Sequence, residues 1–505
     1  MIELPRRFRR SVTSSYLRTV TQAGVALVLT PVLVHGLGKT DYGIWTVVLS
    51  LALYLELFEF GLGAATVKAI AEAEAVGDRE RTRRSIATSF WMLAAPGVGA
   101  LLVGVGLAAA FPFVFQIPDR SEEAARILIL LVATDLAISI PSDTFGNTLM
   151  ALQRYDLINV TLIVVLLAQA AAWVLVLALG GGLVALGIVT VLLSLLGQLS
   201  RYLIARRLLR GVSLSRRYVE RGQVRPLARL SAWYALAELS TLVITRLDVV
   251  VVGLVVGVPE AAVYAVAQKL AFLALQVIQP TVLAFFPHSS ALAARLERAA
   301  LRPAIVTGTR VSMAAAGPLT LTLGLLAEPA LGVWVGDGFA EGATVVVFLA
   351  GAAAVSALTR TGFLMLQGAG IARRPGLISG FEAALNLVLS VALGRAMGIE
   401  GVALATLIAA CIAQLGLLLP YAARTFGLSW RALVATVLRA HVPAALVAAG
   451  VGWLVLRAEI SDYGRLIGAG AAIAGSYLAT LAITGVDGTE RRLALAFLRG
   501  RAAER

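Results

Sequence analysis

The sequence predicts an all-α integral membrane protein whose chain crosses a bilayer many times. Of its 505 residues, 59% are hydrophobic and only 14% are charged, whereas a soluble globular protein carries about 25% charged residues. This is too little charge to cover the surface of a soluble protein of this length. The apolar runs are about 20 residues long and do not alternate in hydropathy, which favours spanning helices over a barrel.

Fourteen apolar segments are long enough to form spanning helices. We expect these spans at 17–36, 43–66, 86–113, 126–149, 158–179, 183–205, 230–256, 261–286, 304–327, 343–367, 377–396, 401–421, 438–456 and 465–485.

The connections between the spans are of two kinds. One kind is rich in arginine and occurs at 1–18, 67–85, 150–157, 206–229, 287–303, 368–376, 422–437 and 486–505. The other kind is short and nearly free of lysine and arginine. By the positive-inside rule the first kind faces the cytoplasm, so we expect a multi-pass protein of the bacterial inner membrane with both termini in the cytoplasm. The first helix is expected to be retained rather than cleaved as a signal peptide.

The longest connection, 206–229, carries eight arginines. It predicts either a basic linker that lies on anionic lipid or a solvated loop that follows the topology rule.

A shift of 219 residues aligns the first half of the chain with the second. It places Gly38 on Gly257, at the turns before the second and eighth spans, and Gly182 on Gly401, at the tight turns before the sixth and twelfth spans. An even number of spans in each copy predicts two parallel six-helix lobes related by a pseudo-two-fold axis along the membrane normal, followed by two unmatched helices. The predicted domains are an N-lobe at 1–219, a C-lobe at 220–437, the unmatched helices at 438–485 and a basic cytoplasmic tail at 486–505.

Ionisable side chains within the apolar segments are candidates for a functional site, because a charge in hydrocarbon costs about 3 kcal/mol or more. Arg246 and Asp248 are two residues apart, so they do not face each other on a helix. A role in lining a cavity and a buried structural ion pair are the alternatives for them. Lys269 and Arg360 lie at depths that suit binding of a phosphate or pyrophosphate group. Snorkelling to the inner interface is the alternative for Arg360.

Acidic side chains form a second group of candidates. Glu56 and Glu59 share one face of the second segment, where they could carry a coupling proton or pair with arginines of neighbouring loops. Asp143 follows Pro141, which frees a backbone carbonyl and predicts a kink. Buried acids outnumber buried bases, which argues against a simple positive cavity for an anion. Other ionisable groups in the segments are Asp135, Glu238, Arg310 and Glu382.

Signatures of catalysis and metal binding are missing from the sequence. No HExxH, GxSxG or P-loop motif is present, and the three histidines lie far apart. Cys411 is the single cysteine, so the chain forms no intrachain disulfide. We therefore expect a protein that is not an enzyme and that uses no cofactor or metal. Because the excess of arginine follows the positive-inside rule, no nucleic-acid partner is expected.

Three stretches of the sequence carry a resemblance to a known family. They are LGKTDYGIWTVVLSLALYLELFEFGLGAA at 37–65, RLDVVVVGLVVGVPEAAVYAVAQKL at 246–270 and NLVLSVALGRAMGIEGVALATLIA at 386–409. In this order they resemble the first hairpin, the helix 7–8 region, and helix 11 with the turn into helix 12 of bacterial polysaccharide-export proteins, the Wzx-type flippases. This resemblance covers helices 1–12 and identifies the chain as a member of the multidrug/oligosaccharidyl-lipid/polysaccharide (MOP) exporter superfamily.

The resemblance implies a fold and an activity. It implies two six-helix lobes that form a V around a central cavity, as in multidrug (MATE) and lipid II (MurJ) transporters, and movement of a polyprenyl-pyrophosphate-linked oligosaccharide to the outer leaflet by alternating access. By position, Asp248, Lys269 and Asn386 match the family pattern. The expected partners are this lipid-linked substrate and membrane lipids, with polysaccharide polymerases and glycosyltransferases as further candidates.

The pyrophosphate is expected to engage basic side chains in the cavity. The candidates are Arg18, Arg246, Lys269 and Arg360, and the coupling-ion candidates are Glu56, Glu59, Asp143 and Asp248. Transport of lipid II ranks second, because helix 1 has no dense arginine set beyond Arg18. A multidrug antiporter ranks third, because helix 1 carries no acid. A non-transporting scaffold for glycan assembly is the remaining alternative.

Overall fold

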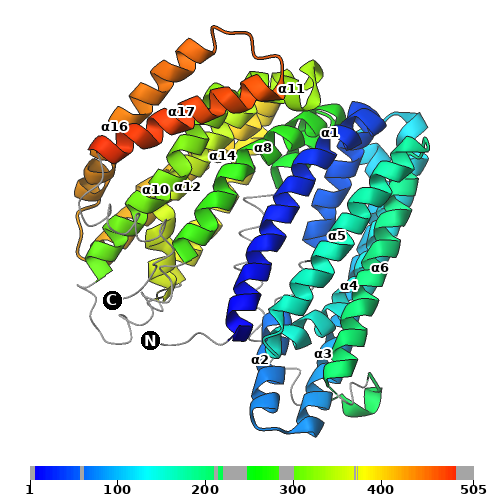
Figure 1. Ribbon diagram of the computed structural model, residues 1–505. Coiled ribbons are helices and arrows are strands. Elements are labelled where there is room, and N and C mark those ends of the chain that lie inside the picture. Colours follow the sequence, from blue (N-terminus) through cyan, green and yellow to red (C-terminus); the bar gives the residue numbers. More distant parts are fainter. Residues whose placement is uncertain are drawn as a thin grey trace. The chain divides into compact units, whose positions relative to one another are not determined.

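The computed structural model describes residues 6–56, 62–209, 214–219, 247–283, 301–368, 371 and 373–484. Within these ranges every regular element is a helix, as the sequence predicts (Figure 1). The chain divides into two compact units, unit 1 at 1–262 and unit 2 at 263–505.

Unit 1 contains long helices joined by short connections. Asp78 caps α3 by accepting a hydrogen bond from the backbone N–H of Arg81 (2.9 Å). Its elements are α1 (Arg6–Glu56), α2 (Leu62–Ala75), α3 (Arg79–Phe115), α4 (Asp119–Ala151), α5 (Tyr155–Ala178), α6 (Leu183–Leu208), the 3-10 turn η2 (Arg216–Tyr218), a helix at 247–255 and the start of α8 (Val258–Leu283).

α1 is a helical hairpin, because Gly38 has φ 76° and ψ 168° and interrupts the helix. In Figure 1 the blue ribbon of α1 turns back on itself at the end near its label. Ser14, in the first half, accepts a hydrogen bond from Asn159 of α5 (3.0 Å). Ala52 and Leu55, in the second half, pack in a cluster with side chains of α3 and α4. α1 therefore contains the span predicted at 17–36 and residues 43–56 of the span predicted at 43–66.

The helix at 247–255 and the start of α8 pack against α1 and α3. Gly253 lies against Val47 of α1 and Phe115 of α3. Gly43 approaches the carbonyl oxygen of Val258 so closely that a Cβ atom would have no room. These backbone approaches explain why this part of the chain groups with unit 1.

Unit 2 contains the remaining helices. α10 and α11 meet at a bend of 75°, so the arginine-poor connection predicted at 328–342 is mostly helical. Besides the rest of α8, its elements are α10 (Leu301–Leu325), α11 (Ala327–Val335), the 3-10 helix η4 (Asp337–Gly342), α12 (Ala343–Gly368), α13 (Arg373–Met397), α14 (Ile399–Ala410), the π-helical η5 (Cys411–Leu418), α15 (Leu419–Thr425), α16 (Trp430–Val455) and α17 (Tyr463–Thr484).

The two units repeat one order of helix packing. In unit 1, α3 packs on α4, α4 on α6 and α5 on α6. In unit 2, α10 packs on α12, α12 on α14 and α13 on α14. Gly38 and Gly257, which lie 219 residues apart, both have positive φ and both break a helix. Each unit therefore has the helix packing expected of one copy of the internal repeat that the sequence predicts.

The two helices predicted to lack a counterpart, α16 and α17, pack on each other and on α10. Their contact is mostly apolar and consists of small side chains of α16 against Ile473 and Leu481 of α17. A buried hydrogen bond of 2.9 Å joins His441 of α16 to Tyr477 of α17. The Tyr477 hydroxyl also lies directly against Gly317 of α10.

The described residues contain ten helices that are long and apolar enough to span a membrane, or eleven if the bent α10–α11 pair counts as one span. The first of these, 17–55, holds two of the predicted spans, because it includes the Gly38 turn. Most of the span predicted at 230–256 and part of the one at 261–286 lie outside the described residues. The total of fourteen stays a prediction, as do the domain boundaries at 219 and 437.

Several helices extend beyond their predicted spans. The connection predicted at 67–85 is helical up to Ala75 and again from Arg79. Ion pairs one turn apart, such as Arg84–Glu80 (3.4 Å), stabilise such polar ends. Pro141 does not end α4, which continues to Ala151 and lies against Gly97 of α3 at this point. The kink at Pro141 stays a prediction.

Candidate functional site

In unit 1, polar side chains line the contact between α4 and α6. Arg201 of α6 forms an ion pair with Asp143 of α4, with 3.3 Å between Nη1 and Oδ1. The Gln198 side chain hydrogen-bonds the same carboxylate. Asp135, two turns before Asp143, hydrogen-bonds Ser194. We call Asp135, Asp143, Gln198 and Arg201 the α4–α6 seam.

The α4–α6 seam is incompletely satisfied. Asp135 Oδ1, Gln198 Oε1 and Arg201 Nε are buried and have no hydrogen-bond partner among the described residues. Burying such atoms costs about 1–3 kcal/mol each unless water or a ligand supplies the missing bond. The seam can therefore accept water or polar groups of a ligand between two apolar helices.

The structure places the coupling candidate Asp143 in this seam. Its side chain is 36% exposed and that of Arg201 is 15% exposed. Arg201 and Gln198 were not among the residues predicted from sequence, although their spacing puts them on one face of the sixth segment.

Arg18 lies in the first half of α1, which packs on α5. Its side chain is half-buried, and its Nε has no hydrogen-bond partner in the described part of the chain. Asp248 also belongs to unit 1, where it is 1% exposed at the start of the helix at 247–255.

In unit 2, a stripe of polar side chains runs along one face of α13. Glu382, Asn386 and Ser390 are each four residues apart, and they are 5%, 1% and 0% exposed. The opposite face carries exposed apolar residues such as Val388, which is 65% exposed. We call these three polar residues the α13 stripe.

Neighbouring helices satisfy the α13 stripe only in part. Asn386 donates a hydrogen bond from Nδ2 to Thr406 Oγ1 of α14 (2.9 Å). Asn386 Oδ1 and Ser390 Oγ are buried, and no described residue bonds them. Like the α4–α6 seam, the stripe thus keeps hydrogen-bonding capacity inside an apolar unit.

A hydrogen-bonded chain connects the stripe to α12. Thr359 of α12 donates to Oε1 of Gln414 (2.9 Å), and Nε2 of Gln414 donates to Oε1 of Glu382 (2.6 Å). Gln414 lies in η5, a π-helical interruption of the twelfth predicted span. Such π-helical turns are frequent at functional sites. The sequence singled out Glu382 but not Gln414, which is a lone amide in an apolar run.

Two predicted cations also lie in unit 2. Arg360 follows Thr359 on α12, is half-buried and stacks over Phe363 with 5.3 Å between the guanidinium carbon and the ring centroid. Lys269 is half-buried on α8.

Three predicted site residues have no described side chain. Arg246 and Glu59 lie outside the described residues, and Glu56 is the last residue of α1. Of the others, Arg18, Asp143 and Asp248 belong to unit 1, and Lys269, Arg360 and Asn386 belong to unit 2. Within the described ranges, no group of three or more His, Cys, Asp or Glu side chains is placed to hold a metal ion.

Solved structures with a similar fold are transporters. An inward-facing multidrug resistance MATE family transporter of the MOP superfamily has a TM-score of 0.64 at 16% identity, over 82% of this chain and 99% of that one. The lipid II flippase MurJ in an inward closed conformation has a TM-score of 0.69 at 13% identity, over 94% of this chain and 98% of that one. At these identities the likeness shows the fold alone, which is the fold of the MOP superfamily predicted from the sequence.

Sequence comparison identifies the family. A search of curated protein sequences gave no match. The sequence profile of the family described as "Polysaccharide biosynthesis protein" matches residues 8–293, which is more than half of the chain. Together with the MOP fold, this match shows that the chain belongs to the polysaccharide biosynthesis protein family.

Proposed function

We propose that this protein is a flippase that moves a polyprenyl-pyrophosphate-linked oligosaccharide, of the surface-polysaccharide or O-antigen type, across the bacterial inner membrane by alternating access. The match to the polysaccharide biosynthesis protein family carries this proposal. The internal repeat supports it, because transporters built from repeats bind substrate between them and rock one against the other. In this proposal the protein catalyses no covalent chemistry, and both termini lie in the cytoplasm.

Partly satisfied polar groups suit this cargo. A sugar hydroxyl moved into hydrocarbon without a partner costs on the order of a few kcal/mol. The α13 stripe and the α4–α6 seam hold free acceptor and donor atoms inside apolar units. Side chains of this kind can exchange hydrogen bonds with water or glycan during transport. They would thereby lower the free-energy barrier to moving the sugars across the membrane.

In the same proposal, cations bind the pyrophosphate. Arg18, Arg246, Lys269 and Arg360 are the candidates, because guanidinium and ammonium groups form strong charge-assisted hydrogen bonds with phosphate. Asp248, Glu56, Glu59 and Asp143 are the candidates for coupling to an ion gradient, and Asp248 and Asn386 are further candidates for the cavity lining.

Export assays test the pyrophosphate role. In cells that depend on this protein for glycan export, Arg246→Ala is expected to lower export about tenfold, the value of one charge-assisted hydrogen bond. Arg457→Ala is the control, because Arg457 stacks on Trp453 near the end of α16 and is not a candidate. Unchanged export in Arg246→Ala, with normal protein levels, would show that the pyrophosphate role is wrong.

Accessibility labelling separates a carrier from a scaffold. In a Cys411→Ser background, Arg246→Cys and Arg360→Cys should react with membrane-impermeant thiol reagents from both sides of the membrane in turn. Val388→Cys, on the exposed apolar flank of α13, should react from neither side. A scaffold predicts no water-reachable residues at its centre, so a lack of reaction at both test positions from either side would favour it.

Lipid II is the alternative substrate. It is favoured by the extent of the structural match to the lipid II flippase, which covers 94% of this chain. Reconstituted protein that moves lipid II but not a lipid-linked surface glycan between leaflets would decide for this alternative.

A further inference from the structure

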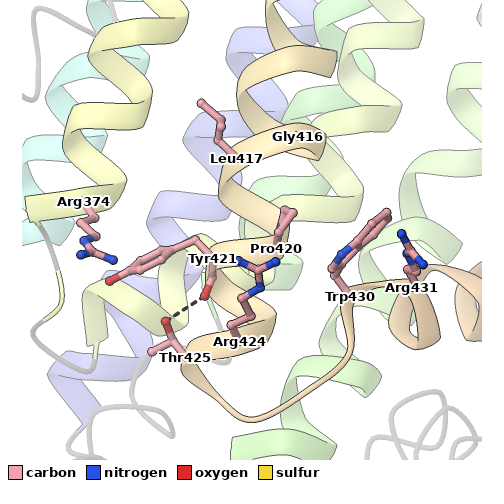
Figure 2. A pocket seen from close by; sticks show the side chains of 9 residues that line it. All are labelled: Arg374, Gly416, Leu417, Pro420, Tyr421, Arg424, Thr425, Trp430 and Arg431. Atoms are coloured by element: carbon pink, nitrogen blue, oxygen red, sulfur yellow. Dashed lines mark hydrogen bonds between the residues drawn. The ribbon is translucent and has the colours of Figure 1, made fainter.

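Unit 2 contains a basic cavity that the proposed transport path does not use. Its volume is about 700 Å³, and it lies where α13, α15 and the start of α16 meet (Figure 2). Three arginines line it: Arg374 of α13, Arg424 of α15 and Arg431 of α16. The arginine-rich connections 368–376 and 422–437 meet here, so the positive-inside rule predicts that this end faces the cytoplasm.

Acidic side chains do not neutralise this cavity. None of the three arginines forms an ion pair with any carboxylate that the structure describes. The sequence explains this, because residues 401–458 contain four arginines and no Asp or Glu. By contrast, the neighbouring Arg302 of α10 is engaged, since its Nε donates to the carbonyl oxygen of Phe426 (3.0 Å). As far as the described part of the chain goes, the positive charge of the cavity is therefore uncompensated.

Aromatic rings hold two of the arginines in place. The guanidinium carbon of Arg374 lies 5.4 Å from the centroid of the Tyr421 ring, and that of Arg431 lies 5.4 Å from the Trp430 ring. Figure 2 shows Tyr421 reaching toward Arg374, with Arg424 between this pair and Trp430. Tyrosine and tryptophan are typical of the level of the lipid headgroups. The Thr425 hydroxyl donates to the Tyr421 carbonyl oxygen (2.8 Å), so this hydroxyl is not available to a ligand.

An apolar surface continues from the arginines toward the membrane interior. Leu377 and Phe381 lie three and seven residues after Arg374 on the same face of α13, and they are 65% and 46% exposed. Leu417 lines the cavity one turn before Tyr421 and is 44% exposed. A ligand with a phosphate at one end and acyl chains at the other would match both parts of this surface.

We propose that this cavity binds the phosphate headgroup of an anionic phospholipid from the cytoplasmic leaflet. Arg374, Arg424 and Arg431 would donate hydrogen bonds to the phosphate oxygens, and the acyl chains would lie along Leu377, Phe381 and Leu417. Arginine suits this role because its planar guanidinium binds phosphate through two parallel hydrogen bonds. Basic pockets between helices at this depth are a known type of site for anionic lipid headgroups.

Native mass spectrometry of the full-length protein tests the proposal. Delipidated protein is titrated with phosphatidylglycerol, and zwitterionic phosphatidylcholine serves as the comparison lipid. Each arginine near a membrane surface contributes about 1 kcal/mol, so changing one to Gln should weaken phosphatidylglycerol binding about fivefold. Changing all three to Gln should weaken it about a hundredfold.

Arg457→Gln is the matched control. Arg457 stacks on Trp453 at 3.7 Å near the other end of α16, outside the cavity, and its change should leave binding as in the wild type. If the triple variant does not fold, Arg424→Gln and the charge-keeping Arg424→Lys replace it, and only the Gln variant should lose affinity. Equal binding by the Arg424→Gln variant, the Arg457→Gln control and the wild type would overturn the proposal.

Two further ligands identify the source of the phosphate. Inorganic phosphate should not compete with phosphatidylglycerol at millimolar concentration. If it does compete, and if its own binding is lost in the Gln variants, the site takes free phosphate and the lipid assignment is wrong. If polyprenyl phosphate binds and phosphatidylglycerol does not, the cavity belongs to the transport substrate, and this too overturns the proposal. The result leaves the proposed flippase activity untouched, because that activity is measured by export.

Discussion

An ion pair between Arg201 and Asp143 joins α6 to α4 inside unit 1, with 3.3 Å between Nη1 and Oδ1. The two residues are 58 positions apart, and each is the other's charge partner in an apolar surrounding. A buried ion pair is costly to form but more costly to break, because removal of one partner leaves an uncompensated charge.

Arg201→Ala should therefore destabilise the protein. We expect a loss of about 2 kcal/mol, less than for a fully buried pair because Asp143 is partly exposed. The double variant Arg201→Met with Asp143→Leu should regain most of this loss, since no charge is left unpaired. Thermal unfolding of the purified proteins measures the loss and its recovery. Arg207→Ala, at the exposed end of α6, is the control.

Transport by the double variant separates the two roles of Asp143. If the ion pair is structural, the double variant exports glycan at a normal rate. If Asp143 carries a coupling ion, export fails although stability is restored. A double variant that is as unstable as Arg201→Ala alone would contradict the ion-pair argument.

The hydrogen bond from Gln414 to Glu382 predicts a contrast between two substitutions. Glu382→Gln keeps an oxygen that can accept from Gln414 Nε2, so stability should change by less than about 1 kcal/mol. Glu382→Leu leaves this buried N–H without a partner and should cost about 1–3 kcal/mol. Chemical denaturation in detergent measures the difference, and equal losses in the two variants would contradict the bond.

Much of this fold could be predicted from the sequence. Apolar runs of spanning length define the helices, and glycines such as Gly38 and Gly257 mark the turns that the repeat places 219 residues apart. These features are local or periodic, so they are readable along the chain. The ends of helices were less predictable, because helices such as α2 continue past the apolar run into charged sequence.

The candidate site was only partly predictable. Lone charges such as Asp143 and Glu382 stand out in apolar runs. Their partners, Arg201 and Gln414, depend on which helices touch and at what rotation, and this information is tertiary. The π-helical turn at η5 shifts the face of the helix on which Gln414 lies, and no spacing rule for an α-helix anticipates it.

The linker that follows α6 predicts a change in protease sensitivity. Trp91 of α3 donates from Nε1 to the carbonyl oxygen of Leu214 (2.8 Å), and the guanidinium of Arg216 stacks over its ring at 4.2 Å. Trp91→Ala removes both contacts, so trypsin should cut after Arg216 several times faster than in the wild type. Arg217→Gln is the control, because Arg217 stacks only on the adjacent Tyr218. Equal cleavage rates in Trp91→Ala and the wild type would show that these contacts do not hold the linker.

Because α16 and α17 pack on α10, replacing either of two glycines of α10 by alanine should change the stability of the protein in opposite directions. A Cβ atom at Gly317 would meet the Tyr477 hydroxyl, which cannot move freely because His441 Nδ1 holds it at 2.9 Å. Gly317→Ala should therefore cost about 1–3 kcal/mol through overpacking. Gly324→Ala has no heavy atom within 4 Å of its new Cβ and should be neutral or stabilising by up to about 1 kcal/mol. Adding Tyr477→Phe to Gly317→Ala should recover only a small part of the loss, because the hydroxyl is removed but the ring carbon Cζ still lies 2.8 Å from the new Cβ. Thermal unfolding of the four proteins gives the comparison, and a stable Gly317→Ala variant would mean that α17 does not press on α10 at this point.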